Sequence, residues 1–486
     1  MSDSSARLLW PPFIYELADL VQSVPTKPPI YLVGGAVRDA CLRREVDDID
    51  IAVNGDAVAL ARWVADAWQA DIYIMDRERG VARVFVKRDE RRVTIDFARF
   101  RGSTLAADLR DRDFTMNAMA ADLLRDPGEL IDPLDGASDL RQRTLRRCSP
   151  RSIADDPIRA LRAVRLSVQF ALKIHPDTAA DIRKRAKGLR RTSPERLRDE
   201  LFKLLSLDKS ARGLRVLGHL SLLQYVFPPL AESEGRASLL IGQGSSWTNS
   251  LAAVERMSVI LKSISGRRTD NTAAAFDLGM LVIQLDRFRA LLQTHFAHVY
   301  GTGRSRAALL VLAAALHGAS AKEARALAKS LMLTSDEQRR LPLIIESYRQ
   351  IAEQAEWSKL DLHRFWHRLG DCGIDAVLLA SAFVLGTEGS QPKQGDWLKF
   401  VERVLTLLDA YFNRFDEVVE PKLLLDGSDI QTLLNVGPGP MIGQLLTALR
   451  EAQVTGEVRS VADARDFVRR YAASLESAGG SAHNYD

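Results

Sequence analysis

The sequence predicts an α+β protein, in which a small head of mixed strands and helices precedes a long all-helical region. Up to about Asp135, short apolar runs of strand character alternate with segments of helical spacing. From Ile158 onward, nearly every long segment has helical periodicity, and β-branched alternation is almost absent. The 486 residues, 46% hydrophobic and 27% charged, have an ordinary globular composition and suggest two to four domains.

The elements of the head follow from its local patterns. Short apolar runs, the first of them ended by a glycine pair, predict strands at residues 30–33, 49–53, 71–75, 81–86 and 93–97. Apolar residues at helical spacing predict helices at residues 36–43 and 57–70. After Asn117 this mixed pattern ends.

Several classes of protein are excluded by composition. No run of 18 or more uncharged apolar residues exists, so no membrane span is expected. The polar residues 1–7 lack the features of a secretory signal. The three cysteines, Cys41, Cys148 and Cys372, are far apart and have no metal-ligand spacing, so we expect reduced thiols in a cytoplasmic protein.

Basic residues are concentrated in one part of the chain. The net charge is only +4, but residues 183–191 (RKRAKGLRR) carry six basic side chains in nine positions. More arginines precede them, at Arg141, Arg143, Arg146, Arg147 and Arg151. Such clusters attract phosphate backbones. A solvated helix face is the alternative interpretation of an isolated charge run.

Two aspartates lie one residue apart in the second predicted strand. Asp48 and Asp50 flank Ile49, so the two-residue period of a strand puts both carboxylates on one face and Ile49 in the core. Adjacent carboxylates repel each other unless a cation neutralises them, and Mg²⁺ typically binds such a pair together with nucleotide phosphates. Most isolated Asp-x-Asp sequences are exposed turns, so the metal-site hypothesis needs support from the surrounding sequence.

The turn before these aspartates supplies that support. Gly34-Gly35 follows the first predicted strand and opens a helix, so backbone N–H groups can approach an anion. Arg38, one turn into the helix, adds a guanidinium for phosphate. A glycine pair alone is most often a tight turn. A glycine turn, an arginine and paired aspartates within 17 residues form a much rarer combination.

These motifs resemble one known family. Residues 32–39 (LVGGAVRD) followed by 48–50 (DID) are similar to the signature of class II tRNA nucleotidyltransferases and bacterial poly(A) polymerases, which have a DNA polymerase beta-like nucleotidyltransferase head. Four further segments match in order: DFTMNAM at 113–119, IDP at 131–133 with Leu140, DDPIR and LRAVR within 155–165, and SPER at 193–196 with Glu200. The resemblance is specific up to Arg196 and looser to about residue 470.

The resemblance implies a template-independent enzyme that adds nucleotides from ATP and CTP to the 3′ end of a tRNA, with Mg²⁺ as cofactor. Asp48 and Asp50 would hold two Mg²⁺ ions, one activating the primer 3′-hydroxyl and one binding the triphosphate. Asp96, on a neighbouring predicted strand, is the candidate third carboxylate. The resemblance also implies nucleotide-binding residues, namely Gly34, Gly35 and Arg38 at the triphosphate, Arg112 and Asn117 near the sugar, Asp156 and Arg159 at the base, and Arg162 and Arg165 on the same segment.

Base reading by Asp156 and Arg159 has a physical basis. Residues three apart on a helix lie on one face, so a carboxylate acceptor and a guanidinium donor are offered together. Cytosine and adenine both present an amino group beside a ring nitrogen, whereas guanine and uracil leave polar groups unpaired. An ordinary helix salt bridge is the alternative. Two departures from the family pattern stand nearby: Asp111 replaces an arginine and Asp155 replaces a glutamate.

The helical region carries a weaker resemblance to metal-dependent HD phosphohydrolases. His317-Gly318 falls where many relatives have a His-Asp pair, and Asn249 stands where those enzymes have an upstream histidine. Loss of a histidine and a bridging carboxylate argues against tight metal binding. We therefore expect an HD-like fold without the hydrolase, in which His317 is a lone helical histidine.

The predicted domain order follows from these motifs and from glycine-rich breaks. We expect an N-terminal extension at 1–27, a catalytic head at 28–138, a neck for base recognition and RNA binding at 139–210, a degenerate HD-like body at 211–385, a helical tail domain at 386–475 and a disordered end at 476–486.

The head motifs do not choose the product. CCA addition is the leading hypothesis, and CC-only addition, A-only addition and poly(A) synthesis share the same motifs. Residues 75–86 are expected to contribute to a mobile loop that switches one site from C to A. A catalytically inactive RNA-binding protein is the alternative of another class, and the intact Asp48 and Asp50 argue against it.

Overall fold

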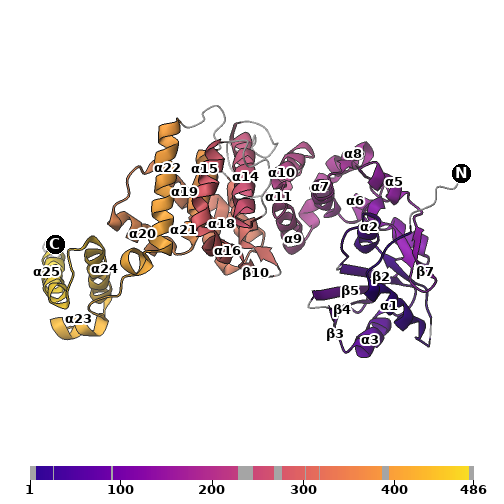
Figure 1. The fold of residues 1–486 in the computed structure, drawn as a ribbon, viewed down its shortest axis with the longest axis horizontal. Helices are drawn as coiled ribbons and strands as arrows, with labels where there is room; N and C mark the ends of the chain where they lie inside the picture. Colours follow the sequence, from indigo (N-terminus) through magenta and orange to yellow (C-terminus); the bar gives the residue numbers. More distant parts are fainter. Residues whose placement is uncertain are drawn as a thin grey trace, which may run out of the picture. The chain divides into compact units, whose positions relative to one another are not determined.

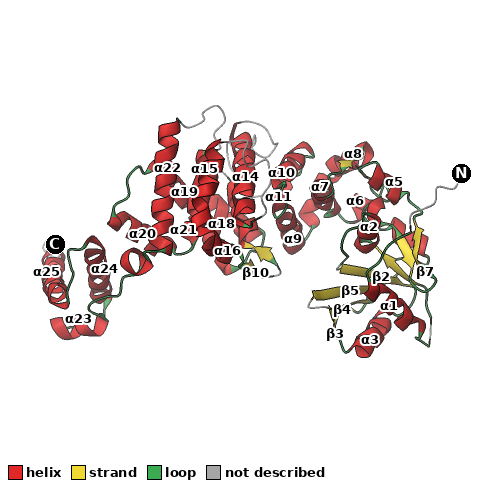
Figure 2. Ribbon diagram, viewed as in Figure 1, coloured by secondary structure: helices red, strands yellow, loops and turns green. Residues whose placement is uncertain are grey.

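The computed structural model describes residues 7–25, 27–46, 48–88, 91–227, 245–266, 276–301, 303–316, 318–385 and 393–480. The chain forms two compact units, Met1–Leu204 with Val216–Val226, and Leu205–Arg215 with Phe227–Asp486. The expected α+β architecture is confirmed, because the large sheet lies in the first unit and the second is largely helical (Figure 2).

A seven-stranded mixed sheet forms the head. Its strands are β1 (Ile30–Val33), β2 (Asp48–Val53), β3 (Asp71–Asp76), β4 (Val81–Arg88), β5 (Arg91–Arg99), β6 (Ala120–Asp122) and β7 (Asp126–Ile131). The strand order is β3-β4-β5-β2-β1-β6-β7. β2 and β5 pair in parallel, and the other neighbours are antiparallel. Helix α2 (Gly35–Cys41) follows β1 directly.

The two faces of strands β2 to β5 differ in character. Alternate residues such as Ile49, Val84 and Ile95 are at most 1% exposed. Helix α3 (Ala57–Trp68) packs against β3, β4 and β5 and covers this apolar side (Figure 1). We call the opposite side the open face. The register places on the open face Asp48, Asp50, Thr94, Asp96, Arg83, Phe85, Tyr73 and Asp71.

Residues 75–86 do not form the expected loop. They lie largely in the β3–β4 hairpin, which turns at residues 77–80. Ala82, Val84 and Val86 alternate with more exposed residues and are buried, so the apolar side of β4 fixes the segment in the sheet.

The predicted N-terminal extension is part of the head. Helix α1 (Pro12–Gln22) buries Ile14, Leu17 and Val21. The indole of Trp10 donates to the carbonyl of Pro127 at 2.6 Å, beside β7. The extension is therefore anchored on the edge of the sheet that lies far from β3.

The first unit continues with short helices. After α4 (Leu105–Arg110) and the 3-10 turn η1 (Thr115–Asn117) these are α5 (Gly136–Arg141), α6 (Ser152–Asp155), α7 (Arg159–Gln169), α8 (Pro176–Arg185), η2 (Ala186–Arg191), α9 (Pro194–Leu205), α10 (Ser210–His219) and α11 (Leu223–Val226). The strands β8 (Thr144–Leu145) and β9 (Lys173–Ile174) pair in parallel. The basic run 183–191 spans the end of α8 and η2, where Arg183, Lys184, Lys187, Arg190 and Arg191 are exposed.

The second unit is built of longer helices. Its principal helices are α14 (Ser245–Ile264), α15 (Phe276–Leu285), α16 (Arg289–Phe296), α17 (Arg306–Ala315), α18 (Ala321–Ser330), α19 (Ser335–Glu353), α20 (Lys359–Leu369), α21 (Cys372–Val384), α22 (Gln394–Phe412), α23 (Gly427–Leu434), α24 (Pro440–Thr455) and α25 (Val461–Gly480). Strands β10 (Val299–Tyr300) and β11 (Arg304–Ser305) form a small hairpin. The last three helices enclose a small core around Ile430, Leu445 and Val468.

The expected features of this unit are placed as follows. Asn249 lies in α14, Gly318 follows α17 with a φ of +82°, and His317 lies outside the described residues. The HD-like interpretation stays a prediction. The expected disordered end, 476–486, begins inside α25, and residues 481–486 lie outside the described part. A membrane-crossing helix is not found in the parts of the chain that the structure describes.

Candidate active site

The turn between β1 and α2 requires glycine at Gly34. This residue has a φ of +74°, which side-chain-bearing residues rarely adopt. A Cβ atom there would lie 2.7 Å from a carboxylate oxygen of Asp50 and 3.1 Å from a guanidinium nitrogen of Arg112. The next residue, Gly35, donates its backbone N–H to Asp50. The glycine pair therefore lets the backbone approach the Asp50 carboxylate closely.

The strand register brings the three predicted carboxylates together. Asp50 pairs directly with Asp96 across β2 and β5, and Asp48 lies two residues from Asp50 on the same face. Ile49 between them is 1% exposed, so the predicted alternation is confirmed. Burial and the charges of Asp96 and Asp48 raise the pKa of Asp50, although Arg112 and the Gly35 N–H act in the opposite direction. A cation would relieve this repulsion.

Asp96 has a partner that the sequence did not indicate. Arg83, opposite it on β4, donates two hydrogen bonds to its carboxylate at 2.7 and 2.8 Å. The pKa of Arg83 is raised by this hydrogen bond and by the nearby charges of Asp96, Asp48 and Asp50. Within the described ranges, no group of three or more His, Cys, Asp or Glu side chains is arranged to hold a metal ion. The described structure therefore places Asp96 beside the aspartate pair but bound by an arginine.

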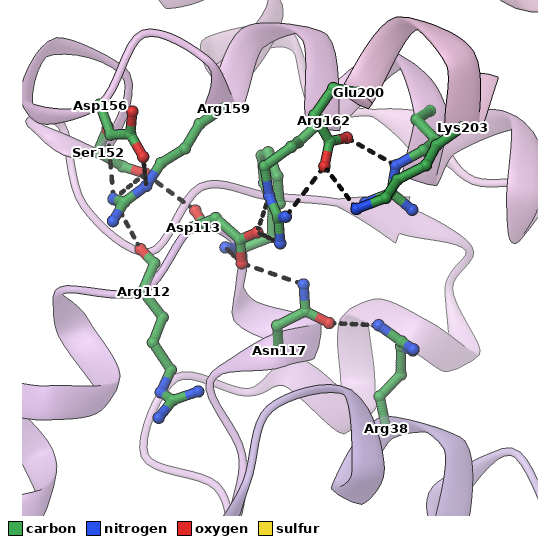
Figure 3. Close-up of polar contacts among 12 residues, drawn as sticks. Arg38, Arg112, Asp113, Asn117, Ser152, Asp156, Arg159, Arg162, Glu200 and Lys203 are labelled. Atoms are coloured by element: carbon green, nitrogen blue, oxygen red, sulfur yellow. Dashed lines mark hydrogen bonds and ion pairs between the residues drawn. The ribbon is translucent and has the colours of Figure 1, made fainter. Parts of the chain in front are cut away.

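A chain of hydrogen bonds connects the phosphate-binding turn to α7. Arg38 donates to the side-chain oxygen of Asn117 at 2.7 Å and lies over the ring of Phe170, 4.3 Å from its centroid. Asn117 in turn donates to Asp113 at 3.0 Å. Figure 3 shows Asp113 between this amide and the guanidinium of Arg162, which donates to it at 2.7 and 3.0 Å. These hydrogen bonds thereby fix the side chains of Arg38, on α2, and Arg162, on α7, in position.

Glu200 of α9 extends the same network. It accepts from Arg165 at 2.7 Å and from Arg162 at 3.3 Å, and its side chain is 7% exposed. These contacts connect α9 to α7. Arg162 is thus held by the carboxylates of Asp113 and Glu200, and Arg165 is held by that of Glu200.

Asp113 is expected to be a major stabilising residue of the first unit. Burial alone would raise its pKa, but the charge of Arg162 and hydrogen bonds from Asn117, Arg162 and the Phe114 N–H lower it. Because the folded pKa is depressed, the ionised group stabilises the fold above its unfolded pKa of about 4 and loses that effect as the pH falls through the folded pKa. We expect Asp113→Asn to lower the free energy of unfolding by about 3 kcal/mol at pH 7, because a buried pair is broken.

Calorimetric unfolding at several pH values checks this prediction. The difference between variant and wild type should shrink below about pH 4. Asp155→Asn is the matched control, since its pair with Arg151 is exposed on both sides and should contribute less than about 1 kcal/mol. Equal unfolding temperatures for Asp113→Asn and wild type at pH 7 would contradict the assignment.

The predicted base-reading pair is not on one continuous helix. α6 ends at Asp155 and α7 begins at Arg159, while Asp156 has an extended backbone with φ −141° and ψ 95°. Pro157 accounts for the break, because the residue before a proline is disfavoured in the α region. The two side chains still lie near each other, with 3.9 Å between Arg159 Nε and an Asp156 oxygen. The prediction of one continuous helix was therefore wrong, but the two side chains do lie close together.

Each member of this pair is positioned by other groups. Arg159 donates Nη2 to the carbonyl of Asp111 at 2.7 Å, and Nη1 to the carbonyl of Arg112 at 3.2 Å and the hydroxyl of Ser152 at 3.1 Å. It is 8% exposed. Asp156 accepts two hydrogen bonds from Arg196, at 2.8 and 3.1 Å. Arg196 therefore sets the position of the Asp156 carboxylate, and the backbone at residues 111–112 sets the position of the Arg159 guanidinium.

A single pocket of about 480 Å³ collects these groups. Every predicted site residue lines it except Asp48, which is exposed beside it. Three charged lining residues had no predicted contact role, namely Arg101, Asp113 and Arg196. Asp113 and Arg196 lay within recognised motifs, whereas no motif marked Arg101, which lies 3.6 Å from Asp111. Arg101 thus places a cation beside the position where the family pattern has an arginine.

Two family models match the N-terminal half of the chain. Residues 30–146 match the poly A polymerase head domain, and residues 171–233 match the probable RNA and SrmB-binding site of polymerase A. The first match covers the sheet and the carboxylates, and the second covers the basic run after α7.

Relatives match nearly the whole chain. The CC-adding tRNA nucleotidyltransferase of Geobacter sulfurreducens is 33% identical over 445 residues, which are 90% of this chain and 91% of that protein. The A-adding tRNA nucleotidyltransferase of Deinococcus radiodurans is 32% identical over 462 residues, 92% and 96% of the two chains. The CC-adding enzyme of Synechocystis is 29% identical over 465 residues, 94% and 98% of the two chains.

Solved structures share the fold. A CCA-adding enzyme in complex with ATP superposes with a TM-score of 0.64 at 21% identity, covering 95% of both chains. The Thermotoga maritima CCA-adding enzyme complexed with tRNA gives 0.57 at 21% identity, also covering 95% of both chains.

The sheet, the paired aspartates and the glycine turn are the features of a nucleotidyltransferase head, in agreement with the family match. The chain belongs to the class II CCA-adding enzyme and poly(A) polymerase family, and it is a tRNA nucleotidyltransferase.

Proposed function

We propose that this enzyme adds the sequence CCA to the 3′ end of tRNA, from CTP and ATP, with Mg²⁺ as cofactor. The observation that carries the proposal is the single pocket in which the glycine turn, Asp50, Asp96 and the Asp156–Arg159 pair meet. A nucleoside triphosphate with its base toward α7 and its phosphates toward β1 would contact all of these groups.

The carboxylates suit a magnesium site. Asp48 and Asp50 offer hard oxygen ligands on one face of β2, and burial, together with the charges of Asp96 and Asp48, raises the pKa of Asp50. When bound, Mg²⁺ would activate the primer hydroxyl and neutralise charge on the triphosphate. Asp96 is the proposed third ligand, which requires its carboxylate to exchange the Arg83 guanidinium for the cation.

The remaining side chains orient the nucleotide. Gly34 and Gly35 bring backbone N–H groups to the phosphates, and Arg38 and Arg112 lie beside them with positive charge. Asn117, held by Asp113, lies between the phosphate turn and α7, which suits a contact near the sugar. These groups hold the reacting phosphate in place without contributing a proton to the reaction.

Base selection falls to Asp156 and Arg159. The Asp156 carboxylate accepts from the amino group of cytosine or adenine, and Arg159 Nε donates toward the adjacent ring nitrogen. Both nucleobases present this pattern, while uracil would leave the carboxylate facing a carbonyl oxygen. The exposed cations of the 183–191 run supply charge for the tRNA backbone.

CC-only addition is the second candidate, because two of the full-length relatives carry that activity in their names. The pocket serves either product, since both reactions begin with cytidine transfer.

Extension of defined primers separates these products. We expect tRNA transcripts ending before CCA, after C and after CC to be extended with labelled CTP or ATP in Mg²⁺, and to stop after the terminal A. A stop after CC would establish the CC-adding enzyme, and extension only of the primer that ends in CC would establish an A-adding enzyme. A long adenosine ladder would replace the proposal with poly(A) synthesis.

A further inference from the structure

A cross-strand row of side chains leads from the candidate metal site to the edge of the sheet. Asp50 pairs with Asp96, Asp96 pairs with Arg83, and Arg83 pairs with Tyr73 on the edge strand β3. Because directly opposite residues in a sheet point to the same side, all four side chains lie on the open face. Three strand spacings separate Asp50 from Tyr73, a distance of about 14 Å.

The far end of this row is aromatic, apolar and exposed. Tyr73 is 63% exposed, and Met75, two residues along β3 at an irregularity in the strand register, is 49% exposed. Phe85, on β4, also lies on the open face. The guanidinium of Arg92 lies over its ring, 4.0 Å from the ring centroid. Large aromatic side chains are not needed at exposed strand positions for folding, since α3 covers the other side of these strands. The open face therefore combines rings with the cations of Arg83 and Arg92.

The nucleotide and the RNA 3′ end are expected on opposite sides of the Asp50 and Asp96 carboxylates. The nucleotide pocket lies on the side of Gly34, Arg38 and α7. In-line transfer requires the attacking hydroxyl to approach from the side opposite the leaving pyrophosphate. From Asp50 and Asp96, that side is where the open face continues over β4 to β3.

We propose that Tyr73, with Met75 and Phe85 beside it, is a stacking platform for the unpaired 3′-terminal nucleotides of the RNA primer. Unpaired bases bind proteins by stacking on exposed aromatic rings, and cations between the rings track the backbone. The row Asp50–Asp96–Arg83–Tyr73 joins the 3′-hydroxyl position to a base about 14 Å upstream, a distance that a few nucleotides span. The proposal rests on the proposed function, since it takes the RNA 3′ end as its occupant.

Fluorescence of 2-aminopurine provides a test that is independent of catalysis. The probe is a tRNA acceptor minihelix with a single-stranded 3′ end that carries 2-aminopurine at one of its last three positions in turn. Without nucleotide, wild-type protein should quench the probe most strongly at one position. Tyr73→Ala should abolish that quenching and weaken minihelix binding about tenfold, while Tyr73→Phe should retain both.

Two controls make the result specific. Tyr15→Ala removes another exposed tyrosine, 45% exposed on α1, and should leave quenching and affinity unchanged. CTP affinity should be the same in Tyr73→Ala and wild type, because Tyr73 does not line the nucleotide pocket. Wild-type behaviour of Tyr73→Ala, or loss of quenching in Tyr73→Phe as well, would overturn the stacking platform. Failure of wild-type protein to incorporate nucleotides would instead overturn the proposed function and leave the quenching result to be judged separately.

Discussion

Asp50→Ala is expected to reduce nucleotide incorporation by at least about a thousandfold, and to leave primer affinity within about twofold of wild type. Asp50 faces Asp96 across the parallel strand pair and accepts the backbone N–H of Gly35, so it lies where the strand, the glycine turn and the neighbouring carboxylate meet. Its loss removes one of the three carboxylate ligands of the proposed magnesium site. RNA binding depends on exposed cations elsewhere, so it should persist.

Single-turnover incorporation of labelled CTP, together with filter binding of a tRNA transcript, measures both quantities. Asp48→Ala should give the same result, because it removes the other ligand of the pair. Asp126→Ala is the matched control, since this aspartate lies on β7 at the far side of the sheet and forms an exposed pair with Arg7. Incorporation by Asp50→Ala at the wild-type rate would remove the metal assignment.

Local patterns were sufficient to predict five of the seven head strands, whereas β6 and β7, which follow Asn117, were not predicted. The apolar run at 30–33 and the alternation around Ile49 gave strand positions that agree with β1 and β2, and they gave the outward direction of Asp48 and Asp50. Such patterns depend on side chains that are near neighbours in the chain. The parallel pairing of Asp50 with Asp96 joins residues from separate strands, and the family resemblance rather than any local pattern made Asp96 a candidate.

The errors also have local causes. Asp156 and Arg159 were placed on one helix because of their spacing, although Pro157 between them carried the signal for a break. Residues 75–86 were expected to contribute to a mobile loop, yet the strand predicted at 81–86 is present and buries Ala82, Val84 and Val86. In both segments the properties of individual residues predicted the local structure better than the expected family feature did.

The periodicity of the sequence could not predict which charged residues of the second unit are buried. Arg306 contacts His295 at 2.7 Å and Asp371 at 3.0 Å, and His295 contacts Asp375 at 3.1 Å. Charged positions in amphipathic helices are normally solvent-facing, so their pattern predicts exposure. Here Arg306, His295 and Asp375 are at most 8% exposed, because they satisfy one another where α16, α17 and α21 meet.

Arg159→Ala is expected to lower the selectivity for CTP over UTP by about a hundredfold, measured as the ratio of kcat/KM values on a primer that ends before CCA. In the proposed base contact, uracil would leave both the fixed Asp156 carboxylate and the Arg159 donor unpaired. Arg196 holds the carboxylate through two hydrogen bonds, so the donor is the member of the pair that this substitution removes. Arg151→Ala is the matched control, because Arg151 is 82% exposed and pairs only with Asp155 among the contacts of its side chain.

The structure also allows Arg159 to act indirectly, and the kinetics distinguish the two roles. Its Nη1 and Nη2 atoms hold the carbonyls of Arg112 and Asp111, so the alanine variant also loosens the segment that carries Arg112 into the triphosphate pocket. Loosening alone would raise KM for CTP and UTP by the same factor and leave their ratio unchanged. A direct contact with the base changes the ratio, because uracil no longer faces an unpaired donor. An unchanged ratio with raised KM values would therefore make Arg159 a positioning residue for the phosphate side and would contradict base reading by the pair.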